Sequence, residues 1–126
     1  MSRINIRDLS VEYGTKNKSF KAVDRVNLDI KEGESVSLLG ASGCGKSTLI
    51  STIDGLRRPS GGTIFIDGEP ISGTGKDRSI VFQNYSLFPW MTVKKNVEFG
   101  LRQLRPELSK KERNDIALEF VEKVGL

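Results

Sequence analysis

The sequence predicts an α/β fold with an antiparallel β portion and the beginning of a helical subdomain. Apolar residues nearly alternate with polar ones in two early segments, 4–11 and 26–30, which is typical of half-buried strands. A glycine-rich loop, 40–45, lies between a short apolar segment and a helical pattern. Residues 116–124 carry apolar side chains three and four positions apart, as on one face of a helix.

Composition limits the class of protein and the kinds of partner. A chain of 126 residues with 37% hydrophobic content has the size of one ordinary domain. Its charge of +4 comes from 20 basic and 16 acidic residues that are interspersed, so we expect no nucleic acid partner. The single cysteine, Cys44, excludes an intrachain disulfide and fits a reducing compartment. The sequence has no long apolar run and no signal-peptide pattern, which predicts a cytoplasmic location.

Two strands are predicted in the first thirty or so positions. Their alternating apolar residues are Ile4, Ile6, Leu9 and Val11 in the first strand, and Val26, Leu28 and Ile30 in the second. A polar stretch from Gly14 to Lys21 separates the two patterns. We therefore expect half-buried strands joined by an exposed connection across this stretch.

A strand, a loop and a helix are predicted next. Residues 35–39 form a short apolar run, which predicts a buried strand ending at Gly40. A helix is predicted over 48–53, with Gly55 suited to its C-terminal cap. A strand, a glycine-rich loop and a helix in this order can build an anion-binding site.

Two further strands complete a β-rich core that is predicted to extend over about 1–91. Residues 63–66 are predicted as a strand, and Asp67-Gly68 behind them favours a tight hairpin turn. Residues 79–82 form another short apolar run, which ends at Gln83.

The remaining residues, 92–126, are predicted to begin a helical subdomain. Thr92 can cap a helix that runs to about Leu104, and Pro106 closes it. Ser109 and Glu112 have capping-box spacing before a second helix. Its apolar face would consist of Ile116, Ala117, Phe120, Val121 and Val124.

The glycine-rich loop has the chemistry needed to hold a nucleoside triphosphate. Its three glycines permit close approach and the positive φ values of a concave nest of N–H groups. Lys46 would reach the β- and γ-phosphates, the Ser47 hydroxyl would ligate Mg²⁺, and Thr48 would lie at the α-phosphate. The predicted phosphate-binding residues are Gly40, Ser42, Gly43, Cys44, Gly45, Lys46, Ser47 and Thr48. The sequence therefore predicts binding of Mg-ATP.

Cys44 has a second possible interpretation, as a reactive nucleophile. The chain contains no histidine that could act as its base, so a Cys–His pair is impossible. We interpret Cys44 as a small residue that fits the loop.

The chain resembles the nucleotide-binding subunits of ABC transporters over essentially its whole length. The resemblance depends on Tyr13, on residues 26–34, on GASGCGKSTLISTIDGLRRPSGGTIFIDG, on 80–84 and on 92–97. Residues 75–78 and 87–93 resemble the importers of nitrate, sulfonates or taurine within that family. The resemblance implies the fold of P-loop NTPases and ATP hydrolysis that energises uptake of a small anion.

The same resemblance implies roles for residues outside the loop. Tyr13 would stack on adenine, with Phe20 as the rival and core packing as the alternative for both. Gln83 would approach Mg²⁺ and the attacking water, so Lys46 and Gln83 are the predicted catalytic residues, and Ser47 and Gln83 the predicted metal ligands. An apolar cluster of Leu87, Phe88, Trp90 and Met91 would either dock on a permease or pack in the core.

Partners and location also follow from the resemblance. It implies a transmembrane permease subunit, a second ATP-binding subunit in a homodimer or pseudo-dimer, and, indirectly, a periplasmic or extracellular solute-binding protein. The chain would lie on the cytoplasmic side, held peripherally at the inner face of the membrane by the permease.

The chain departs from the family pattern after Gln83. No Ser-Gly-Gly, no Asp-Glu pair and no histidine follows, although the family uses all three for turnover. We therefore expect a truncated, N-terminal half that binds ATP without hydrolysing it. Another P-loop enzyme, such as a kinase or GTPase, is the remaining alternative, but neither an acceptor site nor Asn-Lys-x-Asp is visible.

Overall fold

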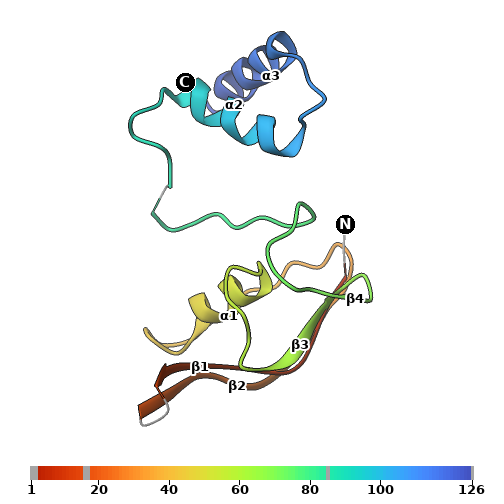
Figure 1. Cartoon of the computed structure of the whole chain (residues 1–126), viewed down its shortest axis with the longest axis vertical. Helices are drawn as coiled ribbons and strands as arrows, with labels where there is room; N and C mark the ends of the chain where they lie inside the picture. The colour runs from red at the N-terminus through yellow and green to blue at the C-terminus, as the bar shows by residue number, and fades with distance from the viewer. Residues whose placement is uncertain (1–2, 16–17, 85, 126) are drawn as a thin grey trace. The chain divides into compact units, whose positions relative to one another are not determined.

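The computed structural model describes residues 3–15, 18–84 and 86–125, in two compact units (Figure 1). The first unit is Met1–Ile80 and the second is Val81–Leu126. This division by internal contacts falls earlier in the chain than the domain boundary predicted near residue 91, which stays a prediction. Gln83 and the apolar cluster at 87–91 consequently belong to the second unit.

The first unit is built on a four-stranded antiparallel sheet with the strand order β2-β1-β3-β4. The strands are β1 (Ile4–Thr15), β2 (Lys18–Ile30), β3 (Gly61–Ile66) and β4 (Glu69–Pro70). Helix α1 (Lys46–Ile53) packs on this sheet through Leu49 (Figure 1). The buried core cluster is Ile6, Leu9, Val11, Val23, Leu49 and Ile64. Its apolar burial stabilises the arrangement of α1 on the sheet.

A bulge in β1 explains why the predicted alternation is imperfect. The pairing of β1 with β2 shifts register between Ile6 and Leu9, and Asp8 adopts a φ of 47°. One extra residue in β1 shifts the alternation of the following side chains by one position along the strand. Ile6 and Leu9 are therefore both buried although three positions separate them.

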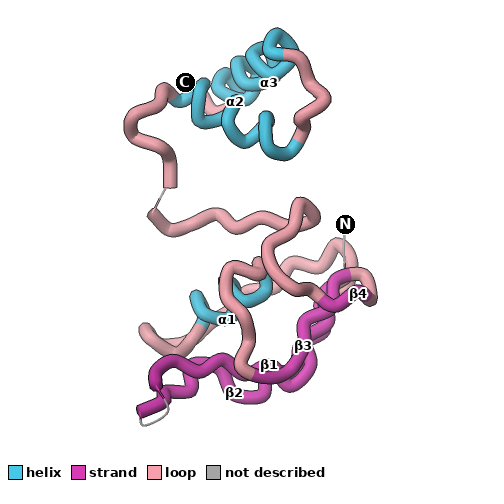
Figure 2. Tube along the Cα trace, in the orientation of Figure 1, coloured by secondary structure: helices cyan, strands magenta, loops and turns pink. Residues whose placement is uncertain are grey.

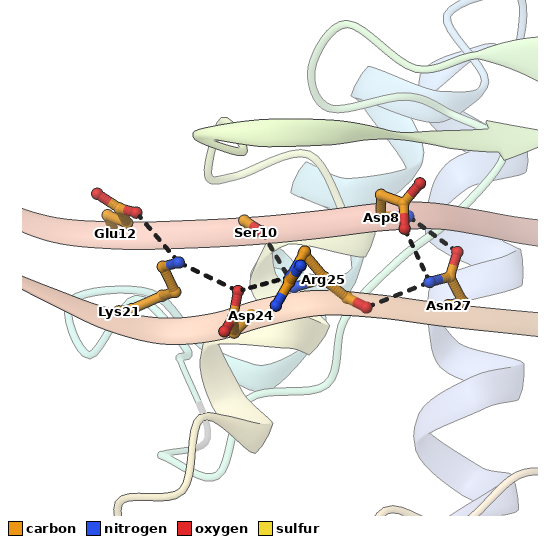
Figure 3. A network of polar contacts seen from close by, with 7 residues as sticks. All are labelled: Asp8, Ser10, Glu12, Lys21, Asp24, Arg25 and Asn27. Carbon is orange, nitrogen blue, oxygen red and sulfur yellow. Dashed lines mark hydrogen bonds and ion pairs between the residues drawn. The ribbon is translucent and has the colours of Figure 1, made fainter.

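Polar side chains hold the irregular part of the β1–β2 pair (Figure 3). The Asn27 side chain accepts from the Asp8 N–H at 3.0 Å and donates to the Asp8 carboxylate at 3.0 Å. The Arg25 N–H donates to Ser10 Oγ at 3.0 Å. These bonds replace ladder bonds that the bulge interrupts, so backbone groups in the shifted region stay satisfied.

The prediction of a long exposed connection between the first two strands is largely wrong. Strand β1 continues to Thr15 and β2 begins at Lys18, with Gly14 paired to Ser19. Backbone pairing in a hairpin needs no apolar side chains, so a polar stretch can extend both strands. Residues 16–17 lie outside the described part of the chain.

The strands predicted at 35–39 and 79–82 are also not formed. Figure 2 shows the segment between β2 and α1 as loop, and 79–82 is loop as well. Leu39 is 93% exposed and Val81 is 97% exposed, while Val36 and Leu38 line an apolar groove of about 490 Å³ beside α1. No ladder partner for either run exists among the residues that the structure describes, and an unpaired segment is not a strand.

Local turn and cap predictions in the first unit are confirmed. Asp67 and Gly68 join β3 to β4 with φ values of 52° and 89°. Two consecutive positive φ values are the conformation that Asp-Gly hairpin turns favour. The α1 helix covers the predicted 48–53, and Gly55 follows it with a φ of 84° and an N–H bonded to the Thr52 carbonyl at 3.1 Å.

The second unit contains α2 (Val93–Leu104) and α3 (Lys110–Lys123), as predicted. Thr92 accepts from the Lys95 N–H at 3.3 Å, and Ser109 with Glu112 forms the predicted capping box. Hydrogen bonds from the Ser109 side chain and main-chain N–H to the Glu112 carboxylate hold the pKa of Glu112 below its usual value. The cap is therefore complete at neutral pH and weakens in acid, as the pH falls through that lowered pKa. In the described part of the chain, no helix is both long and apolar enough to cross a bilayer.

Candidate functional site: a glycine-rich loop at the start of a helix

The backbone of the loop requires glycine at two positions for different reasons. Gly43 and Gly45 have φ values of 77° and 97°, which side-chain-bearing residues rarely adopt. A Cβ on Gly45 would lie 2.3 Å from the Ala22 carbonyl oxygen of β2, whereas one on Gly43 would meet no atom within 4 Å. Gly40 lacks a positive φ, but a Cβ there would lie 2.7 Å from Cys44 Sγ. The loop is therefore packed closely against β2 at Gly45 and open at Gly43.

The first turn of α1 presents main-chain N–H groups that no side chain caps. Gly45 occupies the N-cap position, and neither a side-chain cap nor an acidic residue in the first turn is found for this helix among the described residues. A helix N-terminus carries unsatisfied donors and the positive end of the helix dipole. The arrangement favours an anion at this end of α1.

Lys46 is the first residue of α1, and its side chain folds back over the loop. Its ammonium group donates to the carbonyl oxygens of Gly40 at 2.7 Å and Ala41 at 2.8 Å. Within 3–15, 18–84 and 86–125, the structure gives Lys46 no carboxylate partner. The positive charge is thus held in place by neutral groups and is available to an anionic ligand.

The next two residues of α1 differ in their surroundings. Ser47 is exposed, so its hydroxyl is accessible to a metal ion, which a hydroxyl oxygen can ligate. Thr48 is half-buried, and its Oγ1 lies 3.0 Å from the Tyr13 hydroxyl. This hydrogen bond connects β1 to the end of the loop.

Tyr13 and Phe20, the two rivals for the adenine, lie directly opposite each other in the β1–β2 ladder. Tyr13 is 37% exposed and bonded to Thr48, while Phe20 is 64% exposed. The Arg57 guanidinium lies over the Tyr13 ring, with its carbon 4.3 Å from the ring centroid. Tyr13 is therefore the member of the pair that is connected to the phosphate loop.

Gln83 is exposed and belongs to the second unit, whereas Ser47 belongs to the first. Their joint contribution to a Mg²⁺ site and the catalytic role of Gln83 stay predictions. Across the described residues, no group of three or more His, Cys, Asp or Glu side chains could hold a metal ion.

The apolar cluster of Leu87, Phe88, Trp90 and Met91 is divided in the structure. Phe88 is half-buried and its ring centroid lies 5.0 Å from that of Phe99 in α2, in an edge-to-face arrangement. Trp90 is 76% exposed and Leu87 59% exposed. Phe88 therefore packs inside the second unit. Leu87 and Trp90 are exposed, as a docking surface requires.

Sequence reasoning assigned no role to two residues that organise these regions. Asn96 of α2 accepts from the Phe88 N–H at 2.8 Å and donates to the carbonyls of Phe88, Met91 and Thr92 at 3.0–3.3 Å. Asparagine is unfavourable inside helices, so an asparagine four residues after the cap could have indicated from sequence that its side chain has a structural role. Arg57 had no such signal, because its contact with Tyr13 joins distant parts of the chain.

Modification of Cys44 is expected to block nucleotide binding, and bound ATP should protect the thiol. Cys44 is exposed, and its Sγ lies 3.6 Å from the Lys46 ammonium. A maleimide adduct at that distance would occupy the space of the phosphates. Labelling rates with and without Mg-ATP, followed by an ATP titration of the labelled chain, provide the measurement. Cys44→Ala treated with the same reagent is the control, and normal ATP binding by the labelled chain would contradict the loop assignment.

Comparison with protein families finds a match to the model described as "ABC transporter" over residues 23–126. Curated relatives include the nitrate import ATP-binding protein NrtD of Synechocystis sp., 49% identical over 98% of this chain and 46% of its own length. The bicarbonate transport ATP-binding protein CmpC of Synechococcus elongatus is 46% identical over 85% of this chain and 16% of its own. The chain thus spans less than half of these relatives.

Among solved structures, the chain is similar to the ATP-binding cassette MJ0796, in a dimeric post-hydrolysis state bound to ADP and Pi. The TM-score is 0.82 and the identity is 35%, over 92% of this chain and 54% of that one. The predicted α/β fold with its antiparallel portion and helices is thereby confirmed.

Proposed function

Because the chain belongs to the ABC transporter family, whose model matches residues 23–126, we propose that it forms the ATP-binding part of an importer ATPase. The parent subunit would hydrolyse ATP and drive uptake of a small anion. The alternative of an unrelated P-loop kinase or GTPase is not favoured by this membership.

The observation that carries the proposal is the geometry at the start of α1. An uncapped helix N-terminus and an ammonium group held by two loop carbonyls point to one place that suits phosphate groups. In the proposed arrangement, Lys46 contacts the β- and γ-phosphates and Thr48 lies at the α-phosphate. The loop residues Gly40, Ser42, Gly43, Cys44 and Gly45 contribute main-chain N–H groups.

The proposed cofactor is Mg-ATP, in which the metal neutralises charge that develops on the phosphates. Ser47 would ligate the ion through its exposed hydroxyl. Gln83 would approach the ion and orient the attacking water. Tyr13 would offer its ring to the adenine, which is consistent with its hydrogen bond to Thr48.

Nitrate and bicarbonate are the transported anions that the relatives' names support. Both are small, planar oxyanions with a single charge. The resemblance at residues 75–78 and 87–93 also predicted sulfonates or taurine, which carry a tetrahedral sulfonate group. The names of these relatives do not include these solutes, so they are the less supported choice. The solute would be selected by other subunits.

The proposed partners are a transmembrane permease, a second ATP-binding subunit and, indirectly, a solute-binding protein. A second ATP-binding subunit is consistent with the dimeric state of the similar cassette. The permease would hold the subunit at the cytoplasmic face of the membrane. Leu87 and Trp90 are the exposed apolar residues proposed to contact it.

The 126-residue chain alone is expected to bind ATP but to release phosphate no faster than buffer. Phosphoryl transfer needs acidic residues that hold Mg²⁺ and orient water, and no Asp-Glu pair follows Gln83 in this sequence. ATP titration and phosphate release are measured side by side on one preparation, with Lys46→Ala as the matched control. Phosphate release that persists in the chain and disappears in Lys46→Ala would contradict the expectation. Absence of ATP binding would instead contradict the proposed function.

A further inference from the structure

Arg57 lies where α1 turns back toward the sheet. Its main-chain N–H donates to the Ser51 carbonyl of α1 at 3.2 Å, which fixes its backbone just after the helix. Its guanidinium carbon lies 4.3 Å from the centroid of the Tyr13 ring. A cation over the face of an aromatic ring is attracted by the negative charge density of that face.

Tyr13 is therefore held by two contacts from different parts of the first unit. Its hydroxyl meets Thr48 Oγ1 at 3.0 Å, so the ring edge is tied to the end of the phosphate loop. Its face is covered by Arg57. An aromatic ring has two faces, and Tyr13 as a whole residue remains 37% exposed. A ring fixed at its edge and on one face is a preorganised surface for a second planar group.

We propose that Arg57 is a positioning residue for the nucleotide base: its guanidinium covers one face of Tyr13 and holds the ring so that the other face receives adenine. This inference rests on the proposed function, because it requires the triphosphate to lie at the loop. Arg57 acts on the base through Tyr13, without touching the phosphates. The guanidinium also polarises the ring, which strengthens stacking on the opposite face.

A neighbouring arginine provides a matched control. Arg58 is exposed and has the same charge as Arg57, but the described residues show no cation–π contact between Arg58 and the Tyr13 ring. If simple attraction between cations and a triphosphate determined affinity, both arginines would contribute alike. If the base is positioned through Tyr13, Arg57 alone would matter.

The test compares ATP with inorganic tripolyphosphate, which has the phosphates and lacks the base. Affinities for both ligands are measured with Mg²⁺ on the chain and on Arg57→Leu, Arg57→Lys and Arg58→Leu. We expect Arg57→Leu to weaken ATP binding about two- to fivefold, as removal of one exposed cation–π contact implies, and to leave tripolyphosphate affinity unchanged. Arg57→Lys should recover part of the loss, and Arg58→Leu should match the parent chain.

Three results would overturn the inference. Equal weakening of both ligands in Arg57→Leu and Arg58→Leu would indicate a general charge effect. Tighter ATP binding by Arg57→Leu would indicate that the guanidinium occupies the face that the base needs, and unchanged ATP binding would indicate that Arg57 has no positioning role. Failure of the parent chain to bind either ligand would be a different outcome, because it would overturn the proposed function itself. Thermal melts of each variant show whether the exposed substitutions alter the fold.

Discussion

Lys46→Ala is expected to remove most of the ATP affinity while the fold persists. The Lys46 ammonium is the cation at the loop, and hydrogen bonds to charged groups contribute about 1.5–3 kcal/mol, which corresponds to roughly ten- to 150-fold in affinity. The same substitution also removes the two bonds that hold the carbonyls of Gly40 and Ala41. The loop should therefore lose both the charge and part of its ordering.

ATP titration of Lys46→Ala, monitored by calorimetry, measures this effect. Lys76→Ala is the control, since Lys76 is an exposed lysine of the same unit that lies outside the loop and its removal changes the net charge equally. A circular dichroism melt distinguishes loss of binding from loss of structure. ATP affinity in Lys46→Ala equal to that of the parent chain would refute the phosphate-loop assignment.

Trp90→Ala is expected to weaken assembly with the proposed permease and to leave ATP binding near normal. An exposed tryptophan is the type of side chain that contributes most at interfaces, where truncation often costs about 2 kcal/mol or more, or about thirtyfold in affinity. Phe88 belongs to the same apolar cluster, so Phe88→Ala is expected to weaken assembly as well. Its contact with Phe99 now implies that it also destabilises the second unit, since half-buried aromatic residues contribute packing energy.

The experiment co-expresses the parent subunit with the proposed permease, and it measures co-purification, transport and ATP affinity. Phe120→Ala is the control, because Phe120 is an aromatic residue of α3 that is 52% exposed and lies outside the cluster. Assembly and transport by Trp90→Ala that equal those of the parent would refute docking at this position. If both Phe88→Ala and Trp90→Ala unfold, the whole cluster is core.

Features determined by local chemistry could be predicted from the sequence. Thr92 and the pair Ser109 and Glu112 bond to N–H groups three residues away, so spacing alone locates both caps. Asp67-Gly68 likewise defines its turn through the φ values that those residues tolerate. The glycine-rich loop was located because strand-like, loop and helical patterns follow one another in a fixed order.

Features that depend on distant partners could not be predicted in this way. The runs at 35–39 and 79–82 have the composition of strands, but pairing is decided by other segments and is missing from the described ladder. The bulge at Asp8 depends on how β1 pairs with β2, and the contact of Arg57 with Tyr13 joins residues that are far apart in sequence. Which of Tyr13 and Phe20 approaches the loop was likewise decided by tertiary structure, through Thr48.

The close approach of Gly45 to Ala22 couples the stability of the loop to that of the hairpin formed by β1 and β2. The loop can keep its shape only while β2 is in place, because the two backbones meet without an intervening side chain. A ligand that binds only this shape of the loop therefore stabilises the hairpin as well, by about 2.7 kcal/mol when its concentration is a hundred times its dissociation constant. Conversely, a change that opens the hairpin in a fraction of the molecules weakens the apparent nucleotide affinity in proportion to the competent fraction that remains, even when it lies far from the phosphates.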